Sequence, residues 1–368
     1  MKRAGTSKAQ VAGAAFLVAL VALGAIYLAT SPQKAATVST TQTESSTQTS
    51  AQTSTSQSAS TATTSTLTSA ARTSSSSTAS SSSSSTSAAG RISHVIVVLM
   101  ENEEYGNVIG SSSAPYQNKL AATYALAANY FGVAHPSLPN YLALVAGGTF
   151  GVTSDCQPAQ CSLPSNVTTI ATLLDSHLLS WKEYAESMPA NCSQVISPDS
   201  LYYPKHNPFV YFSAITGNGG TGSPSGYCDS HVVSMAQFYL DLQSGGLPNY
   251  SFVTPNICHD AHSCPLSTAD QWLSTFVPKV INSSSFATTA LFITYDEGST
   301  NDTRAGGGQV ACIVVSPFAK AGYVSHVEYT HYSLLATVEG IFGLGSLGRN
   351  DASATAMGDL FSPSAQIP

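Results

Sequence analysis

Two polar doublets each follow an apolar run of the sequence. Glu101 and Asn102 come directly after HVIVVLM, and Asp296 and Glu297 come directly after ALFITY. Apolar runs of this length that are rich in β-branched residues are typical of buried strands. Ligand sites of parallel sheets lie beyond the carboxyl ends of the strands. We therefore expect all four side chains to project into one crevice.

Three carboxylates in one crevice repel one another unless a cation lies between them. The doublets therefore predict a divalent cation among Glu101, Asp296 and Glu297. The alternative is that each acidic residue is an ordinary solvated loop carboxylate. Two doublets after two apolar runs favour the cation site.

Ser137 stands at the start of a predicted helix in HPSLPNYLALVAGG. Pro139 suits the first turn, where its missing N–H is not needed, so we expect Ser137 or Leu138 at the N-cap. Free backbone N–H groups and the positive end of the helix dipole then surround the serine, as a phosphate requires. A serine that only caps the helix is the alternative. Coordination to a divalent cation would make the hydroxyl a nucleophile for in-line attack on phosphorus.

Two further segments carry candidate residues. His259, Asp260 and His262 lie in PNICHDAHSC, after the predicted short strand YSFVT, and could ligate a metal or protonate a leaving group. Surface histidines of a disulfide loop are the alternative. Lys205 and His206, in KHNPF, are candidate phosphate contacts or plain loop residues.

Helical patterns separate the apolar runs. A third such run covers 310–315. Buried strands that alternate with helices predict an α/β domain with a mostly parallel sheet, covered by helices on both faces. The predicted helices are 117–128, 138–146, 168–178, 268–281 and 331–342.

The first quarter of the chain differs in composition from the rest. Residues 11–29 are apolar and uncharged, and a helix of this length spans roughly 28 Å, enough for a bilayer. Lys2, Arg3 and Lys8 precede the run, which predicts a cytoplasmic N-terminus and an exported remainder. A cleaved signal peptide is the alternative. We expect a membrane anchor or signal peptide over 1–30, a Ser/Thr-rich disordered linker over 31–89 and an extracellular phosphoesterase domain over 90–368.

Seven cysteines in an exported chain predict three disulfides and one spare thiol. Cys312 lies inside the apolar run VACIVV, and we expect it to be the buried free thiol. Connectivity does not follow from spacing, so pairing by proximity in the sequence is a hypothesis. No CxxC pair supports zinc-finger chemistry. The pairs by proximity are Cys156 with Cys161, Cys192 with Cys228, and Cys258 with Cys264.

Several segments in family order resemble the acid phosphatase and phospholipase C phosphoesterase family of the alkaline phosphatase superfamily. They extend over about residues 92–346 and include HVIVVLMENEEY, HPSLPNYLAL, KHNPFVYF, TPNICHDAHSC, ITYDEG and HYSLLATVEGIFGL. SLPNYLALVAG is also similar to the nucleophile segment of the nucleotide pyrophosphatase and phosphodiesterase branch. The resemblance implies an alkaline phosphatase-like sheet.

The resemblance also implies roles for the matching residues. Ser137 matches the residue that is phosphorylated during turnover, and Asn140 matches an amide that holds a phosphoryl oxygen. Many relatives carry Asp followed by Asp or His where this chain has Asp296 and Glu297, so Glu297 leaves the identity of the metal open. The implied metal ligands are Glu101, Asn102, Ser137, Asp296 and Glu297.

His331 opens the last predicted helix and resembles a late histidine that binds the second metal in two-metal members. A simple helix-start histidine is the alternative. The number of divalent ions, one or two, stays open, because Asp260, His262 and His331 could be ligands or substrate contacts.

These features predict hydrolysis of a small phosphate ester or a phospholipid through a phosphoserine, with a phosphomonoesterase favoured. A phospholipase C or phosphodiesterase is the alternative, and an inactive stalked binding protein is the alternative of another class. A phospholipase needs an apolar rim, which aromatic residues could supply unless they belong to the core. A net charge of −7 with only 9% charged residues predicts no nucleic-acid surface. The aromatic residues are Tyr202, Tyr203, Phe209, Tyr211 and Phe212.

Overall fold

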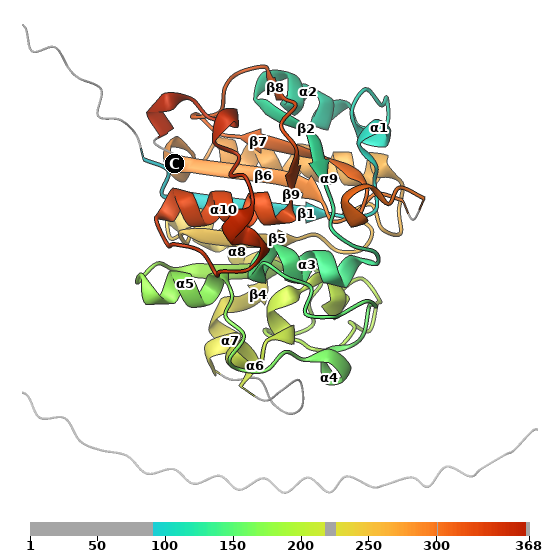
Figure 1. The fold of residues 1–368 in the computed structure, drawn as a ribbon, viewed down its shortest axis with the longest axis vertical. Helices are drawn as coiled ribbons and strands as arrows, with labels where there is room; N and C mark the ends of the chain where they lie inside the picture. Colours follow the sequence, from blue (N-terminus) through green and yellow to red (C-terminus); the bar gives the residue numbers. More distant parts are fainter. Residues whose placement is uncertain (1–90, 218–225, 300, 366–368) are drawn as a thin grey trace, which may run out of the picture. The chain divides into compact units, whose positions relative to one another are not determined.

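The computed structural model describes residues 91–217, 226–299 and 301–365. Nine strands in these residues form one sheet in the order β4-β3-β5-β1-β6-β7-β2-β8, and β9 also pairs with β2. Figure 1 shows β7, β6, β1 and β5 side by side in this order. The strands are β1 (His94–Met100), β2 (Ala125–Phe131), β3 (Trp181–Ala185), β4 (Val232–Ser234), β5 (Tyr250–Thr254), β6 (Thr289–Tyr295), β7 (Gln309–Val315), β8 (Tyr323–Ser325) and β9 (Tyr329–Thr330).

The sheet is mostly parallel, as the sequence predicts. Of the described strands only β7 runs against its neighbours, and it pairs antiparallel with both β6 and β2. The central strands are apolar throughout because both faces of the sheet are covered. Every residue of β6 is buried, and so is every residue of β1 after His94.

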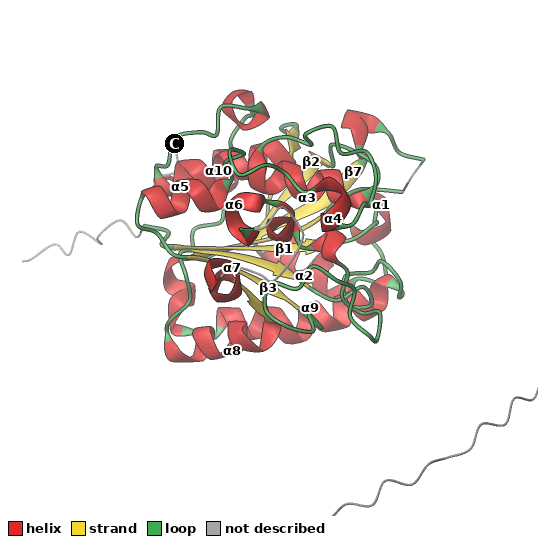
Figure 2. Ribbon diagram, turned by 90° about the horizontal axis from the view of Figure 1, so that it is seen from below, coloured by secondary structure: helices red, strands yellow, loops and turns green. Residues whose placement is uncertain are grey.

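Helices cover both faces of the sheet. Figure 2 shows α3, α5 and α10 on one face and α8 and α9 on the other. The helices are α1 (Tyr105–Val108), α2 (Pro115–Thr123), α3 (Ser137–Ala146), α4 (Pro158–Cys161), α5 (Ile170–Ser176), α6 (Ser213–Thr216), α7 (Gly226–His231), α8 (Met235–Ser244), α9 (Leu266–Ile281) and α10 (His331–Phe342).

The register of β1 against β6 positions the two polar doublets. Met100 pairs with Tyr295, and the backbone N–H of Asp296 donates to the Met100 carbonyl at 2.9 Å. Glu101 and Asp296 are therefore the next residues of two adjacent parallel strands. Their side chains leave the sheet at the same edge.

One predicted helix is partly wrong. The pattern at 117–128 predicts a single helix, but α2 ends at Thr123 and β2 begins at Ala125. Residues 125–128 pair with β7 and β8 instead. The alanines there favour a helix locally, and tertiary pairing overrides that preference.

The predicted disulfides are confirmed. Cys156 is bonded to Cys161, Cys192 to Cys228 and Cys258 to Cys264, while Cys312 is a buried free thiol. The predicted anchor and linker, residues 1–89, lie outside the described residues. Within the part that the structure describes, we find no helix with the length and apolar character that a membrane span requires.

Candidate active site

Four adjacent strands deliver the candidate residues to one edge of the sheet. In the order β3, β5, β1 and β6, each strand is followed by a loop that carries polar side chains. The loop after β3 leads to a 3-10 helix, η1 (Pro204–His206). Glu101 and Asp296 follow β1 and β6 directly, and Asn256 is the second residue after β5. Because these adjacent strands are parallel, their carboxyl ends meet at one edge of the sheet, where the sequence predicts a shared crevice.

The two doublets meet, as the sequence predicts. Glu101 and Asp296 are fully buried, and Glu297 is nearly so. The Asn102 backbone N–H donates to Asp296 Oδ1 at 3.0 Å, and its amide donates to Glu101 Oε2 at 3.3 Å. Asn102 has φ +59, in the left-handed region that asparagine tolerates better than most residues. This turn directs both doublets toward one point.

Ser137 lies between the two doublets. Its hydroxyl donates to Glu101 Oε2 at 3.0 Å and reaches Glu297 Oε1 at 3.5 Å. The helix α3 begins at this residue, with Pro136 at its N-cap, so the positive end of the helix dipole is close to the hydroxyl. The serine is therefore held at a helix N-terminus between carboxylates from two strands.

Asn140 has protein partners for all its polar atoms, and its predicted contact with a phosphoryl oxygen stays a prediction. Its Oδ1 accepts the N–H groups of Val133 and Ala134 at 2.8 and 3.0 Å. Its amide donates to the carbonyls of Ala134 and Pro136 at 2.8 and 3.3 Å. All its bonding capacity is used to fix the turn before Ser137. Asn140 is therefore a positioning residue for the serine.

His206 is buried between two carboxylates. Its Nε2 lies 3.3 Å from Glu101 Oε1, and its Nδ1 lies 3.3 Å from Asp260 Oδ2. The ring stacks on Tyr141 with 5.4 Å between centroids, and the Tyr141 hydroxyl donates to Glu101 Oε1 at 2.6 Å. Both ion pairs lack hydrogen-bond alignment, which leaves the two ring nitrogens and Asp260 Oδ2 without a hydrogen-bond partner.

Lys205 and His262 complete this side of the site. The Lys205 ammonium donates to Asp155 Oδ2 at 2.8 Å and lies 3.1 Å from His262 Nε2. The His262 backbone N–H donates to Asp260 Oδ1 at 2.7 Å. Lys205 and His206 therefore lie beside the Glu101 doublet, and their predicted contact with phosphate stays a prediction.

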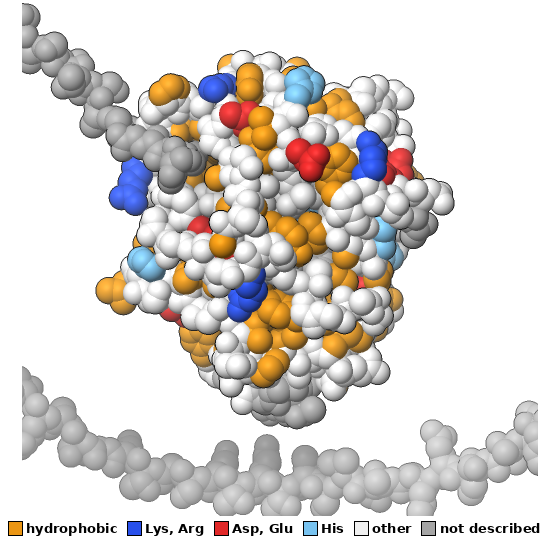
Figure 3. Space-filling view, viewed as in Figure 1, with side chains coloured by type: hydrophobic (Ala, Val, Ile, Leu, Met, Phe, Trp, Pro, Cys, Tyr) orange, Lys and Arg blue, Asp and Glu red, His pale blue; other side chains and the backbone are white. Residues whose placement is uncertain are grey.

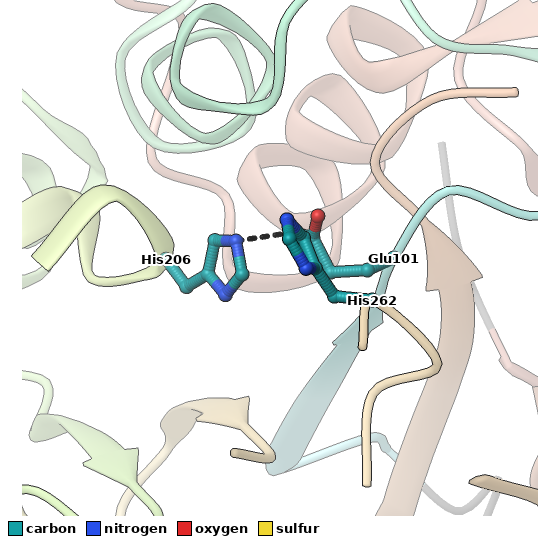
Figure 4. A group of neighbouring side chains, drawn as sticks. All are labelled: Glu101, His206 and His262. Atoms are coloured by element: carbon teal, nitrogen blue, oxygen red, sulfur yellow. Dashed lines mark ion pairs between the residues drawn. The ribbon is translucent and has the colours of Figure 1, made fainter. Parts of the chain in front are cut away.

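The residues present fit a divalent cation. Among the described residues, Glu101, His206 and His262 each offer a ligand atom within 4.8 Å of the others, and Figure 4 shows the three side chains converging. Asp296 Oδ2 is also buried without a hydrogen-bond partner. Carboxylate oxygens and imidazole nitrogens are ligands of several divalent metals. Unpartnered buried atoms of these types point to a missing positive charge.

The pKa values of the acidic groups follow from burial and their neighbours. Burial, with the charges of Glu101 and Glu297, raises the pKa of Asp296 well above its ordinary value. Burial raises the pKa of Glu297 to about 7, although a neighbouring histidine opposes this. Burial also acts on Glu101, but His206 and Lys205 hold its pKa at about 2. Burial and like charge thus act together on Asp296, whereas cationic or histidine neighbours oppose burial at Glu101 and Glu297.

His206 stays charged despite its burial. Burial disfavours the charged ring, but Glu101 and Asp260 raise the pKa of His206 to about 9. Burial raises the pKa of Asp260 to about 6, and His206 limits the increase. In Lys205, burial is outweighed by Glu101 and Asp155, so its pKa is raised. The Lys205 and His206 cations therefore make this part of the site receptive to an anion.

Both ring nitrogens of His331 have protein partners, and its predicted role as a metal ligand stays a prediction. The fully buried ring has Nε2 2.5 Å from the Asp296 carbonyl and Nδ1 3.0 Å from the Tyr130 hydroxyl. Both nitrogens are therefore occupied. Burial lowers the pKa of His331 to about 4, so the ring is neutral at ordinary pH. His331 holds the backbone behind the Asp296 doublet.

His259 points to a different neighbourhood from His262. Its Nδ1 pairs with Glu186 at 2.8 Å, and its ring lies 6.4 Å from that of Trp272. A cavity of about 420 Å³ lies beside these residues. The predicted role of His259 in metal ligation or leaving-group protonation stays a prediction.

The sequence analysis missed one histidine and one carboxylate of the site. His135 forms an ion pair with Glu297 through Nδ1, and its Nε2 lies 2.9 Å from the Asp302 carbonyl. Asp155 accepts a hydrogen bond from Lys205. His135 directly precedes the Pro136-Ser137 segment, which was the available signal. Asp155 carried no signal, because its loop returns to the site only in three dimensions.

One face of the described domain carries few charged side chains (Figure 3). Figure 3 shows acidic and basic side chains that are few and scattered on this face of the described domain, without a basic cluster. The aromatic residues considered for an apolar rim are mostly in the core instead. The buried ones are Tyr202, Phe209, Tyr211 and Phe212.

Two curated relatives of this chain are named as phosphatases. The phosphate-repressible acid phosphatase of Penicillium chrysogenum is 35% identical over 248 residues, which cover 65% of this chain and 57% of that protein. The phosphatidylinositol-3-phosphatase of Mycobacterium tuberculosis is 33% identical over 260 residues, 70% of this chain and 79% of that protein. The chain thus spans little more than half the length of the Penicillium relative.

A solved structure shares the fold. It comes from Bacteroides thetaiotaomicron, in the context of the metabolism of multiple glycosaminoglycans, and superposes with a TM-score of 0.52 at 10% identity, covering 76% of this chain and 83% of that chain. At this identity the likeness shows the fold alone. Residues 111–345 match the phosphoesterase family. They include Ser137 and both residues of the second doublet, and the chain belongs to this family.

Proposed function

We propose that the domain hydrolyses phosphate monoesters through a phosphoserine at Ser137. The observation that carries the proposal is the position of this hydroxyl, which donates to Glu101 at 3.0 Å at the N-terminus of α3. The names of the relatives, acid phosphatases and a phosphatidylinositol-3-phosphatase, support hydrolysis of a phosphate ester. Both kinds of name describe removal of a phosphate group, which favours a monoesterase over a phospholipase C or phosphodiesterase.

The residues of the chain suit a two-step transfer. The Ser137 hydroxyl gives up its proton to the carboxylate that accepts its hydrogen bond, and its oxygen bonds to phosphorus as the bond to the leaving alcohol breaks. The alkoxide that departs takes a proton. His262, beside Lys205, is the proposed proton donor. Water then breaks the Ser137 phosphoester and releases inorganic phosphate. Lys205 and His206 offer positive charge to the phosphoryl oxygens, while Asn140 keeps the serine turn in place.

The proposal includes a divalent cation, one or two in number. The donor atoms that would hold it belong to Glu101, Asn102, Ser137, Asp296 and Glu297, as the resemblance implies, and His262 lies on the Glu101 side as a further donor. A bound cation would lower the pKa of the serine hydroxyl and neutralise the carboxylates. The unpartnered Asp296 Oδ2 supports this part of the proposal.

We further propose that the domain works outside the membrane, tethered by the apolar run at 11–29. Three disulfides support an oxidising compartment. Substrates in that setting include soluble esters and phosphorylated lipid headgroups. The core position of the aromatic residues 202–212 gives no support to an apolar rim for whole lipids.

The test is a Ser137→Ala variant of the full chain assayed with p-nitrophenyl phosphate, its diester and a phosphatidylcholine analogue. We expect the wild type to favour the monoester and the variant to lose at least about 10³-fold in kcat, because the nucleophile is absent. Thermal unfolding of the two proteins should nearly coincide. Mass spectrometry of the wild type quenched during turnover should find phosphate on Ser137.

Each other outcome has a defined meaning. Full activity in the variant would rule out the serine mechanism, and preferred turnover of the diester or the lipid analogue would move the assignment to a phosphodiesterase or phospholipase. A wild type that holds its metal but turns over none of the three substrates would support the inactive binding protein.

A further inference from the structure

A carboxylate of the chain itself occupies the N-terminus of α3. The backbone N–H of Leu138, the residue after Ser137, donates to Asp155 Oδ1 at 3.1 Å. The Lys205 ammonium donates to Asp155 Oδ2 at 2.8 Å. One carboxylate therefore binds a helix N–H group and a cation that lie beside the proposed nucleophile.

The loop that carries Asp155 is braced. It leaves the C-terminal end of α3 after Ala146 and returns to the N-terminal end of the same helix. Cys156, the next residue, is bonded to Cys161, and its carbonyl accepts the Tyr211 hydroxyl at 2.8 Å. The side chain of Asp155 is 28% exposed, so solvent and ligands can reach it. The braced loop therefore holds the Asp155 carboxylate at the site.

Free N–H groups at a helix N-terminus and a lysine ammonium are the usual partners of a phosphate. Asp155 offers these partners two oxygens and a negative charge, as a phosphoryl group would. A phosphate that approaches Ser137 must either displace this carboxylate or bind beside a like charge. Either event weakens the binding of an anion, and weakens it more as the anion's charge increases.

We propose that Asp155 is a specificity-determining residue that lowers the affinity of the site for highly charged phosphate. This inference rests on the proposed function of the site. The carboxylate opposes a phosphomonoester dianion more than a diester monoanion, and it opposes the product, inorganic phosphate, in the same way. Asp155 therefore weakens the binding of the monoester substrate. It also limits retention of the product and so speeds the release of inorganic phosphate.

The test uses inorganic phosphate as the probe with the full-length chain at fixed pH. Asp155→Asn keeps an acceptor for Leu138 but removes the charge, and Asp155→Ala frees both donors. The inhibition constant of phosphate should fall about tenfold or more in both variants, the effect of removing one nearby like charge. KM should fall more for p-nitrophenyl phosphate than for its diester. Asp229→Asn, an exposed residue with the same change in net charge, should leave both values unchanged.

A Lys205→Gln variant separates this inference from a simpler role. It should raise the inhibition constant, because a cation is lost. If Asp155→Asn raises the constant as well, Asp155 only orients Lys205 and the inference is overturned. Unchanged constants in active Asp155 variants overturn it too, and leave the proposed function intact. A wild type and variants that neither bind phosphate nor turn over esters would remove the proposed function, and the inference with it.

Discussion

At the scale of single residues, identical chemistry serves different purposes according to what each side chain touches. His206 and His331 are both buried, yet one is bracketed by carboxylates and the other by a carbonyl and a hydroxyl. The first surroundings favour a charged ring, and the second favour a neutral one. A histidine's place in a motif therefore does not define its role without its partners.

A variant of His331 distinguishes a structural role of this residue from a role as a metal ligand. His331→Asn should shorten the side chain so that Tyr130 and the Asp296 carbonyl lose their partner, at a cost of about 1–3 kcal/mol in the free energy of unfolding. Urea denaturation would measure that loss. Metal per chain, measured by elemental analysis, should stay as in the wild type.

A Glu101→Gln variant provides the comparison for metal content, because Glu101 belongs to both proposed ligand sets. We expect it to bind less metal. Loss of metal in His331→Asn without loss of stability would contradict the supporting role of His331.

At the scale of elements, close backbone contact positions the turn before Ser137. A Cβ at Gly307 would lie 2.6 Å from the Gly132 carbonyl carbon and 2.7 Å from the Val133 nitrogen. Gly132 follows β2 directly, and its N–H donates to the Gly308 carbonyl at 2.9 Å. Glycine is required where two backbones approach this closely.

Gly307→Ala should therefore push the 133–136 turn away from the sheet edge. We expect a loss of about 1–3 kcal/mol in unfolding free energy and a fall in kcat, because Ser137 follows the turn. Gly106→Ala is the matched control, since a Cβ there meets nothing within 4 Å. Equal stability and activity of the two variants would show that the turn tolerates the extra methyl group.

Helices and strands could be predicted from the sequence where the local pattern and the tertiary structure agree. The helix predicted at 331–342 is α10 with the same bounds, and the strand predicted at 94–100 is β1. The prediction for 117–128 failed because alanine-rich residues there pair as β2. Such pairing depends on partners distant in the sequence.

The candidate site likewise contains residues that could be predicted from the sequence and residues that could not. Glu101 and Asp296 could be predicted because the residues that end two neighbouring strands share one edge of the sheet. The partners of Asn140 and His331 could not be predicted, since only the structure gives their hydrogen bonds. Asp155 was beyond sequence reasoning, because it lies opposite Leu138 through the return of a loop.

At the scale of the whole molecule, buried carboxyls away from the site make stability depend on pH in one direction. Burial raises the pKa of Glu183 well above its usual value. Burial and the charge of Asp351 raise the pKa of Glu339 to about 8. The unfolded chain releases these protons near pH 4.3, whereas the folded chain keeps them. Stability from these groups is therefore highest in acid and falls as the pH rises.

Glu339→Gln tests this dependence. The window for Glu339 runs from its unfolded pKa, about 4.3, to its folded pKa of about 8. Across it the variant should gain stability over the wild type by at most about 1.4 kcal/mol per pH unit, with no further change above pH 8. Urea denaturation between pH 4 and pH 9 would measure the difference. Glu328→Gln, at an exposed position, should show no such trend. If the unfolding free energies of Glu339→Gln and the wild type change in parallel with pH, Glu339 does not carry this pH dependence.

The sealed thiol in β7 has a consequence for how the domain matures. Cys312 is fully buried, and burial raises its pKa to about 12. Exchange with a disulfide requires an accessible thiolate, and the folded sheet supplies neither the access nor the ionisation. Once β7 lies between β6 and β2, the only unpaired sulfur among the described residues cannot reshuffle the three bridges. Formation of the sheet therefore protects the three disulfides from exchange with the Cys312 thiol.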